Sequence, residues 1–277
     1  LLRQNGMKYN ETEEFMMKPV ILSLLQSAAN AFDFGGPVLC DAHHYGEGHI
    51  NDTFVVWRED HSKRFILQRI NTDTFTDPVG LMENVCGVTR HLRAKILAEG
   101  GDPIRETLNV IPTLTGDSCY LDADGGAWRA YDFVEDTICL QQVGSEADFR
   151  TVAETLGKFQ NQLADYPAST LHETIARFHD TPNRYANFEK ALAADALGRA
   201  KNIAPEIEFI HAREQDCHVL LDQLAAGEIP LRVTHNDTKI NNVLIDAATG
   251  KGICVIDLDT VMPGLSAYDF GDSIRTG

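Results

Sequence analysis

The stretch His235-Asn236-Asp237-Thr238-Lys239-Ile240-Asn241-Asn242 is the most informative part of this chain. It has the pattern H-x-D-x-x-x-x-N, which places three side chains of different chemistry in one short loop. The Asp237 carboxylate can accept or orient the proton of a hydroxyl group, and Lys239 can meet a γ-phosphate as a point charge. Asn242 lies five positions after Asp237 and can ligate a magnesium ion from the same loop. The spacing is that of a catalytic loop for phosphoryl transfer.

Phosphoryl transfer also needs a carboxylate that holds magnesium against the phosphates, and the sequence offers two candidates. Asp257 follows the apolar run 254–256, whereas Asp269 begins a literal Asp-Phe-Gly triplet. If residues 247–252 form the turn of a hairpin, opposed residue numbers sum to about 499, which places Asp257 opposite Asn242. We therefore predict that Asn242 and Asp257 hold magnesium and that Asp269 caps a helix. Asp259 could share the magnesium or face solvent.

A glycine-containing turn, GEGHINDT at residues 46–53, lies between two candidate strands. Small residues there let backbone amides approach a triphosphate, so we assign Gly46, Gly48, Asn51 and Thr53 to nucleotide binding. A plain hairpin turn is the alternative. His49 could point into the cleft toward a sugar or a phosphate, or lie exposed in the turn.

The next strand reads FILQRI at residues 65–70 and lacks the lysine that a protein kinase has there. Alternation places Gln68 on the face opposite the large apolar side chains, so we predict that Gln68 faces ATP, with Arg69 as the alternative. Glu83 on the following helix is the expected ion-pair or hydrogen-bond partner, unless it is a solvated helix charge. Glu135, in the crossover 133–136, completes the predicted nucleotide-binding residues.

Hydrophobic periodicity separates a strand-rich first part from a mainly helical second part. Helical spacing covers 17–32 and 79–99, and strands are predicted at 54–57, 65–67, 118–121 and 128–134. Further helices are predicted at 149–164, 188–197 and 207–224, and short strands at 231–234, 242–245 and 253–258. These elements predict a bilobal α+β fold of the protein-kinase type. The expected domains are a nucleotide-binding lobe at 20–134 and an incomplete catalytic lobe at 135–277, after a disordered or non-native leader at 1–19.

Composition narrows the classes of partner. Lys and Arg number 24 against 41 Asp and Glu, and the resulting net charge of −17 disfavours nucleic acid and anionic membranes. The 6 cysteines contain no C-x-x-C pair, which argues against a zinc site and a disulfide framework. We expect a cytoplasmic protein of unknown oligomeric state that binds small molecules.

The chain resembles the aminoglycoside phosphotransferase superfamily and, within it, the bacterial N-acetylhexosamine 1-kinases. The matching segments are GEGHINDT (46–53), FILQRIN (65–71), residues 127–134, HDTP (179–182), PLRVTHNDTKINN (230–242) and residues 256–275. The resemblance implies transfer from ATP, with Mg2+, to the anomeric hydroxyl of N-acetylglucosamine or N-acetylgalactosamine in amino-sugar salvage. It implies that Asp237 is the base, that Asn242 and Asp257 bind magnesium, and that residues 46–53 bind phosphate.

Two other interpretations remain open at the level of sequence. The acceptor could be an aminoglycoside, choline or another sugar, since the H-x-D-x-x-x-x-N pattern is specific only to the kinase-like fold. Alternatively, the chain could be a nucleotide-binding pseudoenzyme or an inactive fragment, because the strand lysine is missing and relatives continue past Gly277 with further helices.

Overall fold

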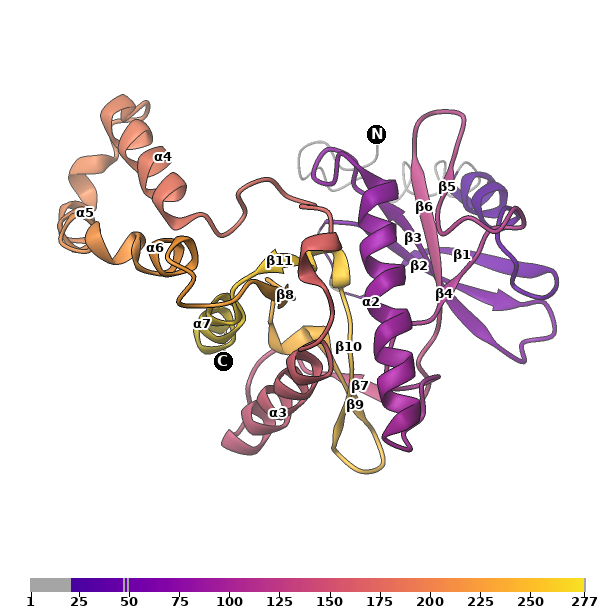
Figure 1. Ribbon diagram of the computed structural model, residues 1–277. Helices are drawn as coiled ribbons and strands as arrows, with labels where there is room; N and C mark the ends of the chain where they lie inside the picture. Colours follow the sequence, from indigo (N-terminus) through magenta and orange to yellow (C-terminus); the bar gives the residue numbers. More distant parts are fainter. Residues whose placement is uncertain (1–20, 47, 49, 277) are drawn as a thin grey trace.

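The computed structural model describes residues 21–46, 48 and 50–276 and shows a strand-rich lobe followed by a mainly helical one (Figure 1). An antiparallel six-stranded sheet forms the first lobe, in the order β1-β2-β3-β6-β4, with β5 also paired to β6. Its strands are β1 (Val38–His44), β2 (Asp52–Arg58), β3 (Arg64–Ile70), β4 (Val110–Ile111), β5 (Tyr120–Leu121) and β6 (Ala127–Asp132). Residues 21–29 form a helix that packs against this sheet through Leu25, Ala28 and Ala29.

Helix α2 (Pro78–Ala98) crosses the sheet and links the cores of the two lobes. It begins where Asp77 accepts a hydrogen bond from the Gly80 amide, just before a proline that suits the first helical turn. Its buried side chains recur at helical spacing, from Leu81 to Ile96. They join one hydrophobic cluster with α3 (Glu146–Gln162) and with the hairpin of the second lobe.

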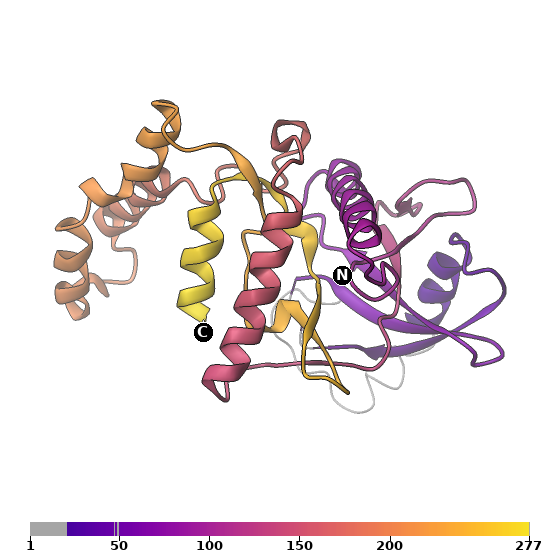
Figure 2. The same ribbon diagram turned by 60° about the horizontal axis from the view of Figure 1, so that its bottom comes forward.

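The second lobe contains two small antiparallel sheets that carry the predicted catalytic loop, residues 235–242. One has the order β10-β9-β7, from β7 (Thr137–Cys139), β9 (Val243–Asp246) and β10 (Gly252–Val255). The other pairs β8 (Arg232–Thr234) with β11 (Met262–Gly264). Helix α7 (Ser266–Thr276) lies beside α3 (Figure 2), and Gln160 of α3 donates a hydrogen bond to Asp269 of α7 at 2.9 Å.

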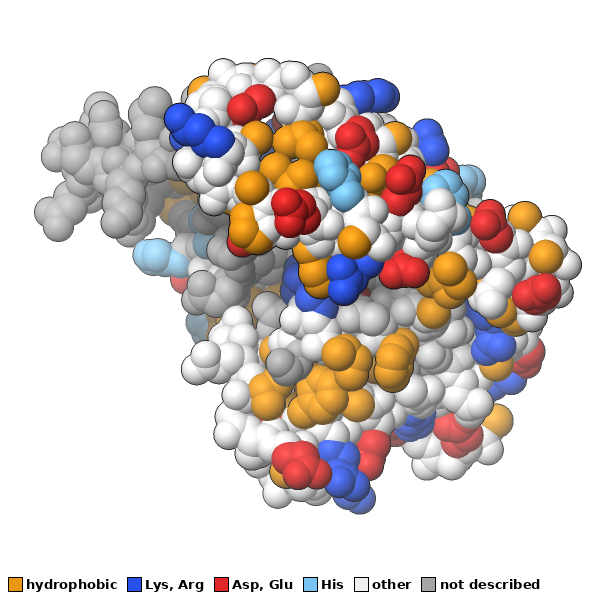
Figure 3. Space-filling view, turned by 90° about the vertical axis from the view of Figure 1, so that its left-hand side faces the viewer, with side chains coloured by type: hydrophobic (Ala, Val, Ile, Leu, Met, Phe, Trp, Pro, Cys, Tyr) orange, Lys and Arg blue, Asp and Glu red, His pale blue; other side chains and the backbone are white. Residues whose placement is uncertain are grey.

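Three helices form an arm that extends from the body of the molecule (Figure 1). They are α4 (Thr181–Ala194), α5 (Ala204–His211) and α6 (Val219–Ala225), and every residue in them is at least partly exposed. Seen from the side of this arm, hydrophobic side chains gather in patches, with acidic and basic side chains around them (Figure 3). Within the described residues, no helix is long and apolar enough to span a membrane.

The structure confirms the predicted fold class, and the differences lie in individual elements. The predicted helix at 207–224 is two helices, because residues 212–218 break it between α5 and α6. Strands β1, β4, β7 and β11 were not predicted. The leader at 1–19 lies outside the described residues, and the lobe boundary at 134/135 stays a proposal, although the first sheet ends at Asp132.

Candidate active site

A cavity of about 580 Å³ lies between the two lobes and is lined by residues of both. Its volume is in the range of sites for small molecules and cofactors. Ile66 of β3 contributes an apolar wall from the first lobe, and Leu244 and Ile256 contribute one from the second. The same cavity is also lined by the glycine-containing turn of the first lobe and by Asp237, Asn242 and Asp257 of the second.

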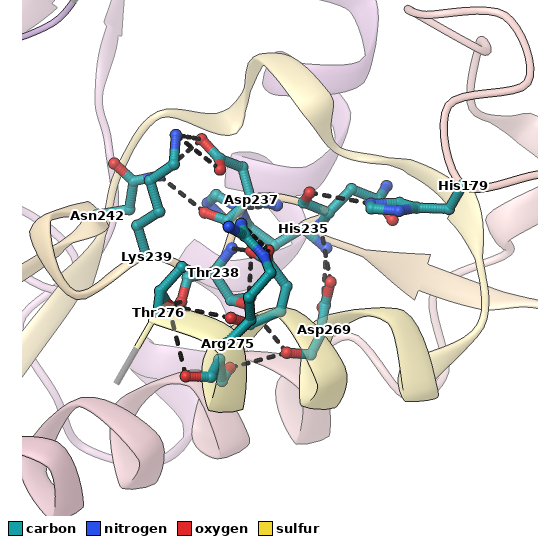
Figure 4. A network of polar contacts seen from close by, with 12 residues as sticks. His179, His235, Asp237, Thr238, Lys239, Asn242, Asp269, Arg275 and Thr276 are labelled. Atoms are coloured by element: carbon teal, nitrogen blue, oxygen red, sulfur yellow. Dashed lines mark hydrogen bonds and ion pairs between the residues drawn. The ribbon is translucent and has the colours of Figure 1, made fainter. Parts of the chain in front are cut away.

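The catalytic loop holds Asp237, Lys239 and Asn242 close together (Figure 4). The Lys239 ammonium group pairs with the Asp237 carboxylate at 2.9 Å. The Asn242 side-chain amide donates to the Asp237 carbonyl oxygen at 2.8 Å and to its carboxylate at 3.3 Å. Since the nitrogen of Asn242 is used in this way, its side-chain oxygen is the atom that can ligate a cation.

Two carboxylates of α7 hold the backbone of this loop in place. Asp269 accepts hydrogen bonds from the amides of His235 at 2.9 Å and Asn236 at 2.7 Å. Asp272 accepts one from the Thr238 amide at 2.7 Å. The predicted N-capping role of Asp269 is therefore wrong, because the residue lies inside α7 and its carboxylate binds the loop. These contacts also explain why the literal Asp-Phe-Gly triplet is unsuited to hold a metal.

The residues before Asp237 have structural roles. His235 is fully buried, and its Nε2 contacts the Ile256 carbonyl oxygen at 2.9 Å. Asn236 adopts the left-handed backbone region with a φ of 67°. Its side chain donates to the Thr260 carbonyl oxygen at 2.8 Å, which helps to hold that conformation. Asp237 is thereby presented at the cavity surface.

Asp257 lies two residues after the end of β10, in the left-handed region at a φ of 60°, and leads into a short 3-10 turn (Leu258–Thr260). The hairpin register differs by one from the prediction: Val255 pairs with Val243, and the Ile256 amide donates to the Asn242 carbonyl oxygen at 2.9 Å. Ile256, rather than Asp257, is therefore opposite Asn242. Asp257 and Asn242 still line the same cavity.

Asp257 is exposed at the cavity surface. The protein atoms around its carboxylate nevertheless displace enough water to raise its pKa to about 6, and the nearby Asp259 carboxylate adds to the increase. A divalent cation would reverse this effect, since it favours the charged carboxylate. A carboxylate and an amide oxygen are ligand types that suit magnesium, which usually takes one or two protein ligands together with phosphates and water. The residues present therefore fit a magnesium ion.

Asp259 is buried and pairs with the buried Arg129 of β6. Its other carboxylate oxygen accepts a hydrogen bond from the Asn51 side chain at 2.6 Å. Burial alone would lower the pKa of Arg129, but the attraction of Asp259 outweighs it and the pKa is raised. Both carboxylate oxygens of Asp259 have partners within the protein. The prediction that Asp259 faces solvent is therefore wrong, and a role as magnesium ligand is disfavoured.

On the nucleotide side, Gly46, Gly48, Asn51, Thr53 and Gln68 all line the cavity. Gln68 faces it as the alternation predicted. The alternative residue, Arg69, is not among the described residues that line this cavity, and its guanidinium group lies over the Trp128 ring, 5.8 Å from the centroid. His49 lies outside the described residues.

Two predicted contacts on this side are wrong. Glu83 of α2 does not serve Gln68 or Arg69, because its carboxylate contacts His172 at 2.7 Å on the surface. Glu135 is absent from the described residues that line the cavity, and its carboxylate pairs with Arg64 at 2.7 Å. In both cases a partner distant in sequence determines where the side chain points.

Arg129 was not among the predicted site residues. This residue lies directly opposite Gln68 in the β3–β6 pairing, so a cation neighbours the position at which β3 itself carries glutamine. The available signal was an arginine within an otherwise apolar strand, since a buried arginine needs a carboxylate partner.

Comparison with known proteins gives a family match over most of the chain. Residues 41–277 match the model of the phosphotransferase enzyme family. An aminoglycoside phosphotransferase from Alicyclobacillus acidocaldarius has a similar fold, with a TM-score of 0.59 and 12% identity over 90% of this chain and 70% of that one.

Two further solved structures align at lower TM-scores. A choline kinase from Streptococcus pneumoniae has a TM-score of 0.47 and 16% identity, over 96% of this chain and 77% of that one. An aminoglycoside phosphotransferase from Streptomyces rimosus, in complex with ADP and streptomycin, has a TM-score of 0.45 and 15% identity, over 97% of this chain and 85% of that one.

Proposed function

Because the chain belongs to the phosphotransferase enzyme family, we propose that it transfers the γ-phosphoryl group of ATP to a hydroxyl group of a small molecule bound between its lobes. One observation carries the proposal: Asp237, Asn242 and Asp257 line the same cavity as the turn that contains Gly46 and Gly48. Phosphoryl transfer needs a base, ligands for the metal ion, and a backbone segment whose amides can approach the phosphates closely.

In this proposal Asp237 orients the acceptor hydroxyl group and receives its proton. The acceptor oxygen forms a bond to the γ-phosphorus, and the bond from that phosphorus to the β–γ bridging oxygen breaks, so that ADP leaves. Lys239 pairs with Asp237 in the structure and is the cation placed to offset the charge of the transferred group. Magnesium bound by Asn242 and Asp257 would neutralise phosphate charge.

The apolar walls formed by Ile66, Leu244 and Ile256 suit a flat base, whereas the acceptor must approach Asp237. For the acceptor we propose an N-acetylhexosamine phosphorylated at its anomeric hydroxyl. The support is the local sequence, namely THNDTKINN around Asp237 and GHINDT in the turn. A cytoplasmic location follows from this role and belongs to the proposal.

The test is an acceptor panel with Mg2+ and ATP: N-acetylglucosamine, N-acetylgalactosamine, kanamycin and choline, with products identified by phosphorus NMR. We expect a sugar 1-phosphate from at least one N-acetylhexosamine. A phosphorylated product from kanamycin or choline alone would support the proposed phosphoryl transfer and reject the N-acetylhexosamine as acceptor.

The matched variant is Asp237→Asn, which keeps the size of the side chain and removes its basicity. We expect turnover to fall by about 100-fold or more while ADP binding, measured by calorimetry, survives. Near-normal turnover in this variant would reject Asp237 as the base.

A further inference from the structure

Three polar side chains form a row across the first sheet, on the side of the cavity. Thr53, Gln68 and Arg129 are directly paired across β2, β3 and β6. Gln68 donates to the Thr53 hydroxyl at 2.9 Å and accepts from Nε of Arg129 at 2.9 Å. The row therefore brings the guanidinium group of Arg129 to the floor of the cavity.

Asp259 of the second lobe connects this row back to the turn. It pairs with Arg129 through one oxygen and accepts from the Asn51 side chain through the other. Asn51 lies two residues before Thr53, so the five side chains close a ring, which we call the polar ring (Asn51, Thr53, Gln68, Arg129 and Asp259). All five line the cavity.

Both sides of the Asn51 amide are held. Its nitrogen donates to Asp259, and its oxygen accepts from the Asn71 amide at 2.9 Å. The end of the glycine-containing turn is thus attached to the 3-10 turn that directly follows Asp257. Backbone amides of the first lobe and the predicted metal ligand of the second are fixed relative to each other.

The charges of the ring balance. The Arg129 side chain is 2% exposed and that of Asp259 is 3% exposed, and each neutralises the other. An unpaired charge at this depth would be strongly unfavourable, so removing either partner must change the arrangement of the other. With so little exposed surface, Arg129 acts through its neighbours.

We propose that Arg129 and Asp259 are positioning residues for the phosphates of the nucleotide: the pair fixes Asn51, and with it the turn at residues 46–53, opposite Asn242 and Asp257. The pair takes the place of the lysine that a protein kinase has on its third strand. Asp259 is therefore a link between the lobes, and Asp257 is the carboxylate that binds metal. This inference rests on the proposed function, because it requires that the cavity binds a nucleotide.

The experiment compares the binding of ADP and of adenosine in the presence of Mg2+, by calorimetry and without any acceptor. The variants are Arg129→Met, Asp259→Asn and the double variant Arg129→Gln with Asp259→Asn, which removes both charges if a single change prevents folding. Lys158→Met is the matched control, because it breaks the Lys158–Glu106 ion pair, of 2.8 Å, away from this cavity. Asp257→Asn is the reference for loss of the metal ligand.

We expect each ring variant to lose about tenfold or more in ADP affinity, the size expected for a charge-assisted hydrogen bond, while adenosine affinity changes by less than about twofold. The Mg2+ concentration that gives half-maximal ADP binding should move in Asp257→Asn and stay in Asp259→Asn. A purely structural role would lower the thermal midpoint of the ring variants and leave their ratio of ADP to adenosine affinity equal to that of Lys158→Met.

That equal ratio would overturn the proposal, and so would an Mg2+ midpoint that moves as far in Asp259→Asn as in Asp257→Asn. A wild-type protein that binds neither ligand would instead reject the proposed function, and with it this inference. The two failures are distinguished by the wild-type titration alone.

Discussion

At the scale of single residues, the predicted catalytic loop and the predicted metal ligand Asp257 share one feature: each contains a non-glycine residue with left-handed backbone geometry. Asn236 and Asp257 both adopt left-handed conformations, although neither is glycine. Such conformations persist where the surroundings hold them, and they are common at functional sites. Here hydrogen bonds donated by the Asn236 side chain and by the Ile256 amide hold the two segments, and Asp237 and Asp257 both line the cavity.

The raised pKa of Asp257 predicts a pH-dependent metal affinity. The pKa of Asp257 in the folded protein is about 6, which is above its ordinary value. In the metal-free protein, Asp257 therefore contributes fully to stability at a pH below that ordinary value. This contribution is lost as the pH rises through about 6. Magnesium binds the charged form, so below pH 6 binding must displace a proton. We expect Mg2+ affinity to weaken by up to about tenfold per pH unit below 6.

Calorimetric titrations of Mg2+ and ADP at pH 5, 6, 7 and 8 measure this dependence. The Asp257→Asn variant supplies the control, because its side chain does not titrate. An equally flat profile in the wild type and the variant would contradict the assignment of Asp257 as metal ligand.

The sequence predicted the residues of the loop better than their partners. Asp237, Lys239 and Asn242 lie within one short segment, so their spacing alone brings them together. Arg129 and Glu83 could not be assigned in this way, because strand pairing sets the neighbours of Arg129 and the rotation of α2 sets those of Glu83. Neither property is encoded in local periodicity.

At the scale of elements, α7 is the support of the catalytic loop. Asp269 accepts from two loop amides and from Gln160 of α3, and it is 3% exposed. Three donors on one buried carboxylate fix the loop to two helices at once. The shape of the loop therefore depends on α7 as much as on its own sequence.

Replacing Asp269 by asparagine should destabilise the fold and slow turnover. The asparagine side chain has the same size, but its NH2 group would face N–H donors that now bind the Asp269 carboxylate. This change should cost about 1–3 kcal/mol in the free energy of unfolding. Urea unfolding and steady-state kinetics measure the two effects, and we expect kcat to fall more than ATP affinity.

Asp77→Ala is the control for this prediction, since it removes the N-cap of α2 and should cost about 1 kcal/mol without a comparable loss of kcat. If Asp269→Asn lowered kcat no more than Asp77→Ala does for the same loss in the free energy of unfolding, support of the loop by α7 would not matter for turnover.

The arm formed by α4, α5 and α6 should be the least stable part of the described chain. Every residue in it is at least partly exposed, whereas α2 buries Leu81, Met82, Val85 and Val88. Local opening costs little where few side chains are buried. We expect arm amides to exchange hydrogen about a hundredfold faster than those of α2, which corresponds to about 2.7 kcal/mol.

Hydrogen exchange followed by mass spectrometry resolves the arm from α2 within one sample. Equal protection of the two would show that the arm is stabilised by contacts other than those in this structure.

The long helices were predicted, whereas four strands were missed, among them the seven-residue β1. Helices α2 and α3 carry several turns of apolar spacing, and both were predicted close to their observed bounds. Strands β4, β7 and β11 have only two or three residues, too few to show alternation. The gap between α5 and α6 was missed because residues 212–218 continue the polar and apolar mixture of the helices around them.

At the scale of the whole molecule, two lobes contribute different groups to one cavity. The first lobe supplies the glycine-containing turn and Gln68, and the second supplies Asp237, Asn242 and Asp257, the proposed base and metal ligands. A shared hydrophobic cluster with α2 connects them, and the Asn51–Asp259 hydrogen bond crosses between them at the cavity. The order of elements in the sequence predicted both lobes, but only the folded chain shows which residues meet.

The most direct measurement is a crystal structure of the protein soaked with Mn2+ and ADP, with the metal located from its anomalous signal. Manganese replaces magnesium at oxygen-ligand sites and can be identified in this way. We predict a metal peak about 2.0–2.3 Å from oxygens of both Asn242 and Asp257, in the cavity that contains Asp237. A metal bound at Asp269, or held by Asp259 after its separation from Arg129, would contradict the account.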